Sequence, residues 1–266
     1  MTDLEIREIV INYYSSQRNM YADHIISHKD CKFIFSDLID DGYYNFLFDF
    51  KCASVDDAEK ILKKNSELFI RRGRVPRIYV VDNNENKQII PKLMKKYDVF
   101  DSDTWFCTEI ANINFAREKI ADVSVELSND RGLVVELVKK GFSTKDANDP
   151  YGFVPDCYWQ ELYNNFGKCQ NGFKTFHFVG SLKGRQIGVA SAVVKGKFAY
   201  LNNLCVQKPY RQRGVANSII KEMLNFLKSH GVEKTIFLTE KNGYPAKIYK
   251  KMGFLPMCDG YCFEMK

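Results

Sequence analysis

The residues best suited to binding chemistry lie in one segment, residues 204–216, which runs Leu-Cys-Val-Gln-Lys-Pro-Tyr-Arg-Gln-Arg-Gly-Val-Ala. Gly214 and Ala216 are small enough to let a ligand approach the backbone closely. Arg211 and Arg213 add positive charge at the same point. If a helix begins here, its first N–H groups have no intrahelical partner and its macrodipole is positive, so the segment predicts an anion site that could hold a phosphate.

The elements on either side of this turn can position it. Residues 198–206 are rich in apolar and aromatic side chains and predict a buried strand. Downstream, apolar residues recur at helical spacing, namely Ala216, Ile219, Ile220, Met223, Leu224 and Leu227. Gly214 is therefore expected at a junction between a strand and a helix N-terminus.

Two motifs in this half resemble those of the GCN5-related N-acetyltransferases. Arg211, Gly214 and Ala216 match the family's Gln/Arg-x-x-Gly-x-Gly/Ala signature, in which the turn binds the pyrophosphate of acetyl-CoA. After a predicted strand at 234–239, the segment from Asn242 through Tyr249 to Gly253-Phe254 is similar to the family's Asn…Tyr-x-x-x-Gly-Phe segment. The resemblance covers about residues 120–266.

The resemblance implies a set of cofactor-binding residues. Backbone groups at the end of the strand would hold pantetheine and the thioester carbonyl, the turn would hold pyrophosphate, and an asparagine would hydrogen-bond the cofactor: Leu204, Cys205, Val206, Arg211, Gln212, Arg213, Gly214, Val215, Ala216 and Asn242. A backbone N–H aimed at the carbonyl would stabilise an oxyanion. The strand residues equally suit a core strand, and Asn242 equally suits an ordinary turn before a helix.

Tyr249 corresponds to the family's general acid, because it lies four residues before Gly253. A tyrosine pKa of about 10 keeps it protonated at neutral pH and within reach of a thiol pKa of about 8.5. The alternative is a core role, since Tyr244, Ile248 and Met252 share its predicted helix.

No general base stands out. Many relatives carry a glutamate on the strand equivalent to 198–206, where this chain has Asn202 and Asn203. Ordered water relayed to Glu240 or His177 is the remaining route, although His177 on an apolar strand suits a core histidine better. Cys205 is not expected to act as a nucleophile, since direct transfer needs none.

The element order of the second half matches the same family. A strand at 123–127 precedes two helices, one around 134–138 and one carrying Trp159, after Pro155. Strand-like runs at 173–179, 186–194 and 198–206 follow, separated by glycine turns that predict an antiparallel meander. With the last helix–strand–helix and a strand near 260–265, the order is β-α-α-β-β-β-α-β-α-β. The predicted class is α/β (α+β), a mixed, mostly antiparallel sheet flanked by helices in the acyl-CoA N-acyltransferase fold.

The first half predicts a β-α-β-α-β order that resembles the second half of the same fold. Its junction at 51–57, Lys-Cys-Ala-Ser-Val-Asp-Asp, lacks glycine, and Asp56 and Asp57 would repel pyrophosphate although they suit a helix N-terminus. We therefore expect a degenerate domain without cofactor at 1–115 and a catalytic domain at 120–266, connected through 112–121. The first domain would pack against the second and shape the acceptor cleft.

Composition limits the other possibilities. The chain has 266 residues, a formal net charge of +6 and no apolar run near the roughly 20 residues that span a bilayer. Residues 1–10 carry Asp3, Glu5 and Glu8 where a signal peptide needs a basic start, so a cytoplasmic protein without a membrane partner is expected. The eight cysteines form no Cys-x-x-Cys pair and predict no metal site. The lysines are scattered, so nucleic-acid binding is only weakly indicated.

Two functions from different classes fit these features. The first is an acetyl-CoA-dependent N-acetyltransferase that transfers acetyl directly to a primary amine, of a small molecule or a peptide. The second is a non-catalytic acyl-CoA sensor or interaction protein, which the missing base and the degenerate first half would suit. The sequence names neither the acceptor nor the oligomeric state.

Overall fold

The computed structural model describes residues 1–28, 31–50, 54–113, 123–142 and 154–264. Three parts of the sequence-based predictions lie outside the described residues. They are most of the connection expected at 112–121, the start of the 51–57 junction with Cys52, and Met265 at the end of the last predicted strand. No helix in the described part is both long and apolar enough to cross a membrane.

Both halves of the chain contain helices and strands. The first half contains α1 (Asp3–Ser16), β1 (His24–Ser27), β2 (Lys32–Phe35), β3 (Phe46–Phe48), α2 (Val55–Ile70), β4 (Arg77–Val81), α3 (Ile90–Lys96) and β5 (Asp98–Glu109). The second contains β6 (Val123–Leu127), α4 (Arg131–Phe142), α5 (Asp156–Asn165), β7 (Lys174–Leu182), β8 (Arg185–Lys195), β9 (Phe198–Val206), α6 (Val215–Ser229), β10 (Lys234–Glu240), α7 (Tyr244–Lys251) and β11 (Pro256–Glu264). The order predicted for the second half is confirmed.

All described strands join one sheet in the order β1-β2-β3-β4-β11-β5-β10-β9-β8-β7-β6. The pairs β3–β4 and β9–β10 are parallel, and the remaining pairs are antiparallel. Each half thus contains a three-stranded meander followed by a parallel crossover through a helix. The mixed, mostly antiparallel sheet of the predicted fold class is confirmed.

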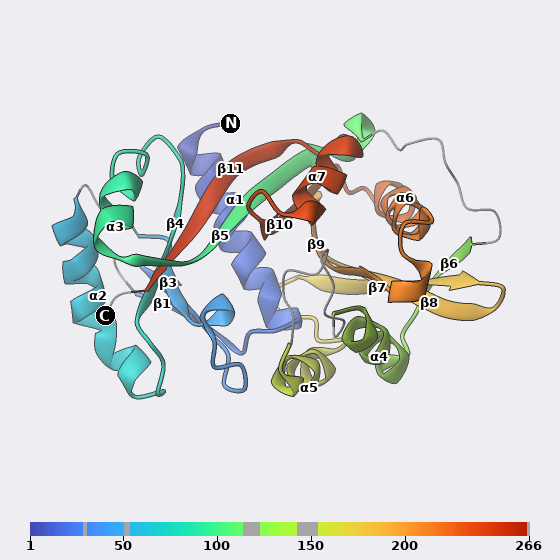
Figure 1. Ribbon diagram of the computed structural model, residues 1–266, viewed down its shortest axis with the longest axis horizontal. Helices are drawn as coiled ribbons and strands as arrows, with labels where there is room; N and C mark the ends of the chain where they lie inside the picture. The colour runs from blue at the N-terminus through green and yellow to red at the C-terminus, as the bar shows by residue number, and fades with distance from the viewer. Residues whose placement is uncertain (29–30, 51–53, 114–122, 143–153, 265–266) are drawn as a thin grey trace.

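The last strands of the two halves change places. β5 pairs with β10 of the second half over Asp103–Glu109, and β11 pairs with β4 of the first half over Gly260–Glu264. β5 and β11 also pair with each other and cross the middle of the molecule together (Figure 1). The sheet is therefore continuous between the halves, and the division at 1–115 and 120–266 stays a prediction.

The helices cover both faces of the sheet. Figure 1 shows α6 on one side of β7 and β8 and α4 with α5 on the other. The helices on the two faces of the sheet belong to separate apolar cores. Ile219 and Met223 of α6 lie in one buried cluster, and Val138 of α4 and Leu162 of α5 lie in another.

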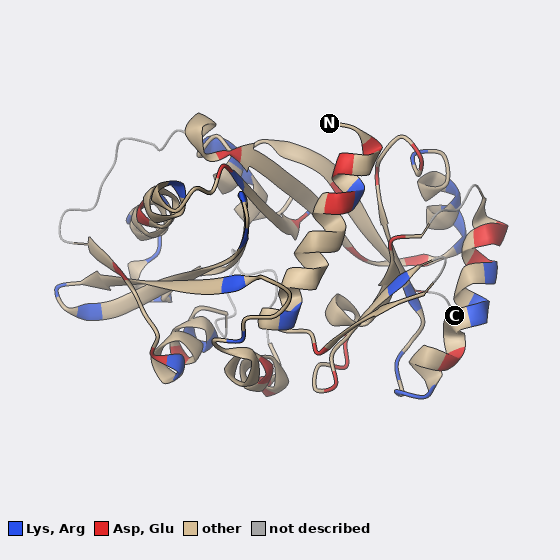
Figure 2. Ribbon diagram, turned by 180° about the vertical axis from the view of Figure 1, so that it is seen from behind, with Lys and Arg blue, Asp and Glu red and all other residues tan. Residues whose placement is uncertain are grey.

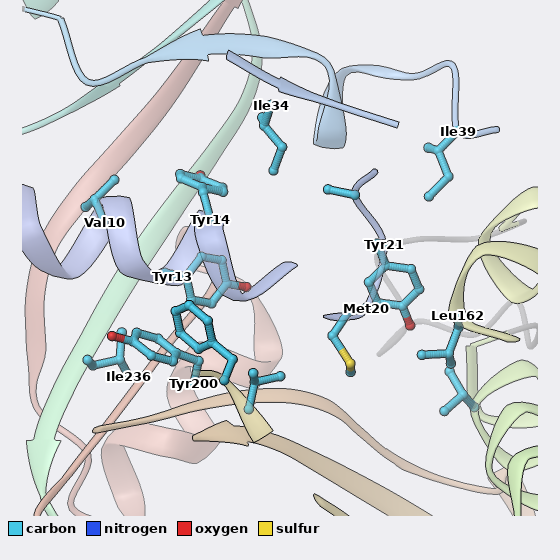
Figure 3. Close-up of a cluster of buried hydrophobic side chains, with 14 of the residues drawn as sticks. Val10, Tyr13, Tyr14, Met20, Tyr21, Ile34, Ile39, Leu162, Tyr200 and Ile236 are labelled. Atoms are coloured by element: carbon cyan, nitrogen blue, oxygen red, sulfur yellow. The ribbon is translucent and has the colours of Figure 1, made fainter. Parts of the chain in front are cut away.

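Helix α1 and the turn after it lie between the two halves. Thr2 and Glu5 form a reciprocal capping box that fixes the start of α1. Tyr13 of α1 packs edge-on against Trp105 of β5 at 4.9 Å and Tyr200 of β9 at 6.3 Å. Figure 3 shows Tyr13 directed toward Tyr200 while Tyr21, after the helix, faces α5. The first half is thus packed against the second through aromatic side chains.

Candidate functional site

The turn at Gly214 has the geometry that an anion site needs. Gly214 adopts φ 76°, a left-handed conformation that favours glycine, and precedes α6 without any side-chain cap on the helix. The first N–H groups of α6 are therefore left for a ligand or water. Gln212, with φ 59°, and Arg213 are both exposed beside them. Among the described residues, Arg213 forms no ion pair, so its charge is available to a phosphate.

Arg211 has a different place from its neighbours in the turn. Its Nε donates to the carbonyl of Val206 at 2.9 Å, and its Nη2 donates to the carbonyl of Gly141 at 2.6 Å. The guanidinium thereby ties the end of β9 to the end of α4. In this structure Arg211 fixes the position of the turn, and the exposed Arg213 is the arginine directed to solvent.

Strand β9 separates from β10 beside the turn. The two strands pair from Lys234–Phe198 to Ile236–Tyr200 and no further. Beyond that point, residues 201, 202, 205 and 206 pair with β8, and no described residue of 201–206 pairs with β10. The edge of β9 on the side of β10 therefore faces a gap at Leu204, and its role in cofactor binding stays a prediction. Cys205 itself is buried against Gly141 of α4, so its thiol serves in packing.

A β-bulge lies where β9 separates. The β8–β9 register shifts between Val189 and Ser191, and Asn203 has φ 56°. Tyr21 donates to Asn203 Oδ1 at 2.6 Å, and Gln17 donates to Asn202 Oδ1 at 3.2 Å. The first half of the chain thus holds the bulge through both asparagines.

A cavity of about 390 Å³ passes through the gap between β9 and β10. Leu204 and Tyr249 line it on the side of the second half, and Tyr43, Asp101 and Asp103 line it on the side of the first. A space of this size suits a small-molecule ligand. The cavity joins the open edge of β9 to residues of the first half.

Tyr249 combines a packed ring with access to the cavity. Its ring lies 4.4 Å from Phe237 and 5.6 Å from Phe254, which fixes its orientation. Burial raises the pKa of Tyr249, with a smaller contribution from Cys205, so the hydroxyl is protonated at neutral pH. The side chain is nevertheless partly accessible because it lines the cavity. Tyr249 thus has a packed ring and also faces the cavity, and its catalytic role stays a prediction.

The two candidates for relaying a proton differ in position. Glu240 lines the cavity. His177 does not line it and is buried, stacked on Phe166 at 4.5 Å with Nδ1 2.8 Å from Ser191 Oγ. Burial lowers the pKa of His177 to about 4. Of these two residues, Glu240 is therefore the one that shares the cavity with Tyr249, and His177 is a core residue.

Asn242, which the sequence predicts to bind cofactor, is exposed in a left-handed turn, φ 61°, before α7, and its role stays a prediction. Other residues around the site were not recognised from the sequence. Asp101 and Asp103 were missed, although their alternation ahead of Trp105 would have indicated two side chains on one face of a strand. Asp41, in the turn before β3, carried no recognisable signal.

Residues 142–254 match the model of the acetyltransferase (GNAT) family. The whole chain superposes on a GCN5-related N-acetyltransferase from Kribbella flavida with a TM-score of 0.68 and 10% identity, covering 99% of this chain and 96% of the other. It also superposes on a protein of unknown function from Staphylococcus epidermidis, with a TM-score of 0.66, 11% identity and coverage of 93% and 96%. A third superposition, on a tandem GNAT protein from the clavulanic acid biosynthesis pathway, has a TM-score of 0.62 and 11% identity. It covers 88% of this chain and 78% of the other. No curated protein matches the sequence.

Proposed function

Because residues 142–254 carry a domain of the GNAT acetyltransferase family, we propose that the chain is an acetyl-CoA-dependent N-acetyltransferase that transfers acetyl directly to a primary amine. The observation that carries the proposal is the separation of β9 from β10, with Leu204 and Tyr249 lining the gap and the uncapped N-terminus of α6 following β9. One cavity would then bring donor and acceptor together.

The described residues suit the donor. Backbone N–H groups of Val215 and Ala216, with the side chain of Arg213, would hold the pyrophosphate at the start of α6. Gln212 and Gly214 supply the left-handed backbone that shapes this turn, and Arg211 supports it from behind. The edge of β9 that faces the gap, at Leu204, would hold pantetheine by strand-like hydrogen bonds. Acetyl-CoA would supply the acetyl group as a thioester.

Tyr249 is the proposed acid. Its hydroxyl, kept protonated by burial, can donate to the sulfur that leaves as a thiolate. Glu240, through ordered water, would accept the proton from the attacking amine, because it is the carboxylate of β10 that lines the same cavity. Backbone N–H groups of the β9 bulge would stabilise the oxyanion.

Release of free thiol from acetyl-CoA in the presence of a panel of primary amines tests this function. The expected result is amine-dependent thiol release at a one-to-one ratio with acetylated product, detected by mass spectrometry. Binding of acetyl-CoA without turnover of any amine would instead favour the acyl-CoA sensor, for which the absence of a carboxylate among the described β9 residues argues.

A further inference from the structure

The described ionisable side chains that line the cavity beside Tyr249 include carboxylates and no basic group. Four carboxylates line it, Asp41, Asp101, Asp103 and Glu240, which we call the acid cluster. The described lining residues include no lysine, arginine or histidine. The acidic residues therefore face one another across a space that no basic side chain of the described part lines.

Strand register places three members of the acid cluster on one face of the sheet. Asp101 and Asp103 lie two residues apart on β5, so both side chains point to the same face. Glu240 of β10 lies directly opposite Asp103. The row thus runs from Glu240 of the second half of the chain to Asp103 and Asp101 of the first half.

The hydrogen-bond partners of the acid cluster are neutral. Tyr79 donates to Asp103 at 3.0 Å, and the backbone N–H of Ser102 donates to Asp101 at 2.8 Å. Asp103 is only 6% exposed, so its carboxylate is held in a weakly solvated place by a single tyrosine hydroxyl. Its burial, and repulsion from Asp101, raise the pKa of Asp103. A cation in the cavity would relieve that repulsion.

Nearby basic side chains have acidic partners outside the cavity, although the pKa of Asp41, which burial raises, is lowered in part by the charge of Arg77. Arg77 pairs with Glu264 at 2.7 Å, and its guanidinium lies 4.5 Å from the centre of the Phe100 ring. Lys241 pairs with Asp259 at 2.9 Å. Neither residue lines the cavity.

Aromatic rings complete the walls around the acid cluster. Tyr158 donates to Asp41, and its ring packs 6.1 Å from that of Tyr44. Burial first, and then all four carboxylates, raise the pKa of Tyr43, which puts this ring within electrostatic reach of the whole cluster. Aromatic faces and carboxylates together form the usual environment of an organic cation.

A metal ion is the less suitable occupant. No three His, Cys, Asp or Glu side chains in the described part gather closely enough to hold one. The tyrosine rings that line the cavity offer apolar surface that a hydrated ion cannot use, whereas an alkyl chain can.

We propose that the acceptor is an amine with a second cationic group: its reacting nitrogen lies between Glu240 and Tyr249, and its far ammonium faces the carboxylates of the first half of the chain, Asp41, Asp101 and Asp103. This rests on the proposed function, which it extends by naming the acceptor class. The first half of the chain then supplies the specificity, and the second half supplies the donor site.

A matched set of amines tests the acceptor class with the full-length protein. Cadaverine carries an ammonium at its far end, pentylamine a methyl group and δ-aminovalerate a carboxylate. In a thiol-release assay at saturating acetyl-CoA, kcat/KM for cadaverine should exceed that for pentylamine by about tenfold or more, with δ-aminovalerate the poorest. Equal values for cadaverine and pentylamine, or a preference for δ-aminovalerate, would overturn the inference and leave the acetyltransferase function standing.

Variants connect the preference to the acid cluster. The double variant D101N/D103N should bring the ratio of cadaverine to pentylamine close to one. Glu109→Gln is the matched control, because Glu109 lies exposed on the same strand and does not line the cavity, and it should keep the wild-type ratio. A full preference retained in the double variant would contradict the proposal.

If no amine is acetylated, a binding measurement tests the cationic acceptor site separately from the transferase function. Calorimetry of cadaverine and pentylamine with the protein in the presence of CoA reports the acceptor site without chemistry. Tighter binding of cadaverine, lost in D101N/D103N, would support the cationic acceptor site while the transferase function failed. Absence of cadaverine binding would overturn the acceptor proposal itself.

Discussion

The hydroxyl of Tyr21 donates a hydrogen bond of 2.6 Å to the side chain of Asn203, which joins positions 182 residues apart in the chain. Asn203 forms the bulge at which β9 leaves β10, and Tyr21 follows the helix that lies between the halves. The first half of the chain therefore holds the backbone of the candidate donor site directly. The first half of the chain thus contributes to the shape of the candidate site.

Removing that hydroxyl should loosen the bulge. Tyr21→Phe leaves Asn203 Oδ1 without its donor in a largely buried place, for which we expect a loss of about 1–2 kcal/mol in the free energy of unfolding. Acetyl-CoA affinity should fall as well, because the β9 edge becomes less ordered. Urea unfolding and calorimetry measure the two effects. Tyr163→Phe, at an exposed tyrosine of α5, is the control and should change neither.

Gly214 tests the anion site. Gly214→Ala strains a left-handed backbone and should cost about 1 kcal/mol of stability, and it should also weaken acetyl-CoA binding by narrowing the approach to the α6 N-terminus. Gly231→Ala is a matched control, because Gly231 has φ 79° with open space around it, beyond the other end of α6. The rise in melting temperature on adding acetyl-CoA should be smaller in Gly214→Ala, unchanged in Gly231→Ala and absent in Gly214→Glu. A full shift in Gly214→Glu would remove the turn from the cofactor site.

Tyr249→Phe separates binding from chemistry. The ring contacts with Phe237 and Phe254 remain, so stability and acetyl-CoA affinity should be nearly unchanged. Loss of the proton donor should lower kcat about a hundredfold. Tyr244→Phe, at an exposed tyrosine of the same helix, should keep wild-type turnover. Wild-type kcat in Tyr249→Phe would end the acid assignment.

The second half could be predicted because its signals are local. The turn at Lys183-Gly184 has φ 50° and 76°, so a tight hairpin follows from the residues themselves. The strand and helix on either side of Gly214 follow from apolar periodicity in the same way. Residues 1–45 were not assigned, because the buried face of α1 mixes tyrosine and serine with its aliphatic residues. The capping pair Thr2 and Glu5 was a usable signal there.

The exchange of strands and the acid cluster could not be predicted. Whether β5 pairs with β4 or with β10 depends on packing between segments more than 100 residues apart, and both choices keep the same alternation of side chains. Asp41, Asp101 and Glu240 meet only because that exchange sets β5 beside β10. A single sequence carries the residues of this cavity, and only the tertiary fold brings them together.

His177 should make stability fall in acid. Burial lowers its pKa from 6.5 to about 4, so below pH 6.5 the unfolded chain binds a proton that the folded chain does not. The free energy of unfolding should therefore lose about 2 kcal/mol from this group between pH 7.5 and pH 5, and nothing above pH 7.5. Urea unfolding at pH 7.5 and pH 5 gives the change in the free energy of unfolding for wild type and for His177→Asn. The difference between these two changes is the contribution of His177. Equal pH slopes in the two proteins would contradict it.

The strand exchange predicts that the second half depends on the first for folding. A chain cut between residues 115 and 116 leaves β10 and β11 without β5, which pairs with both in the intact sheet. Two unpaired edges beside a partly opened core favour aggregation. The fragment 116–266 alone should therefore lack cooperative thermal unfolding, whereas co-expression with 1–115 should restore a soluble complex, because each fragment carries the strand that completes the other. Circular dichroism melts and size-exclusion chromatography measure both. A cooperative melt and acetyl-CoA binding by 116–266 alone would show that the two halves fold independently.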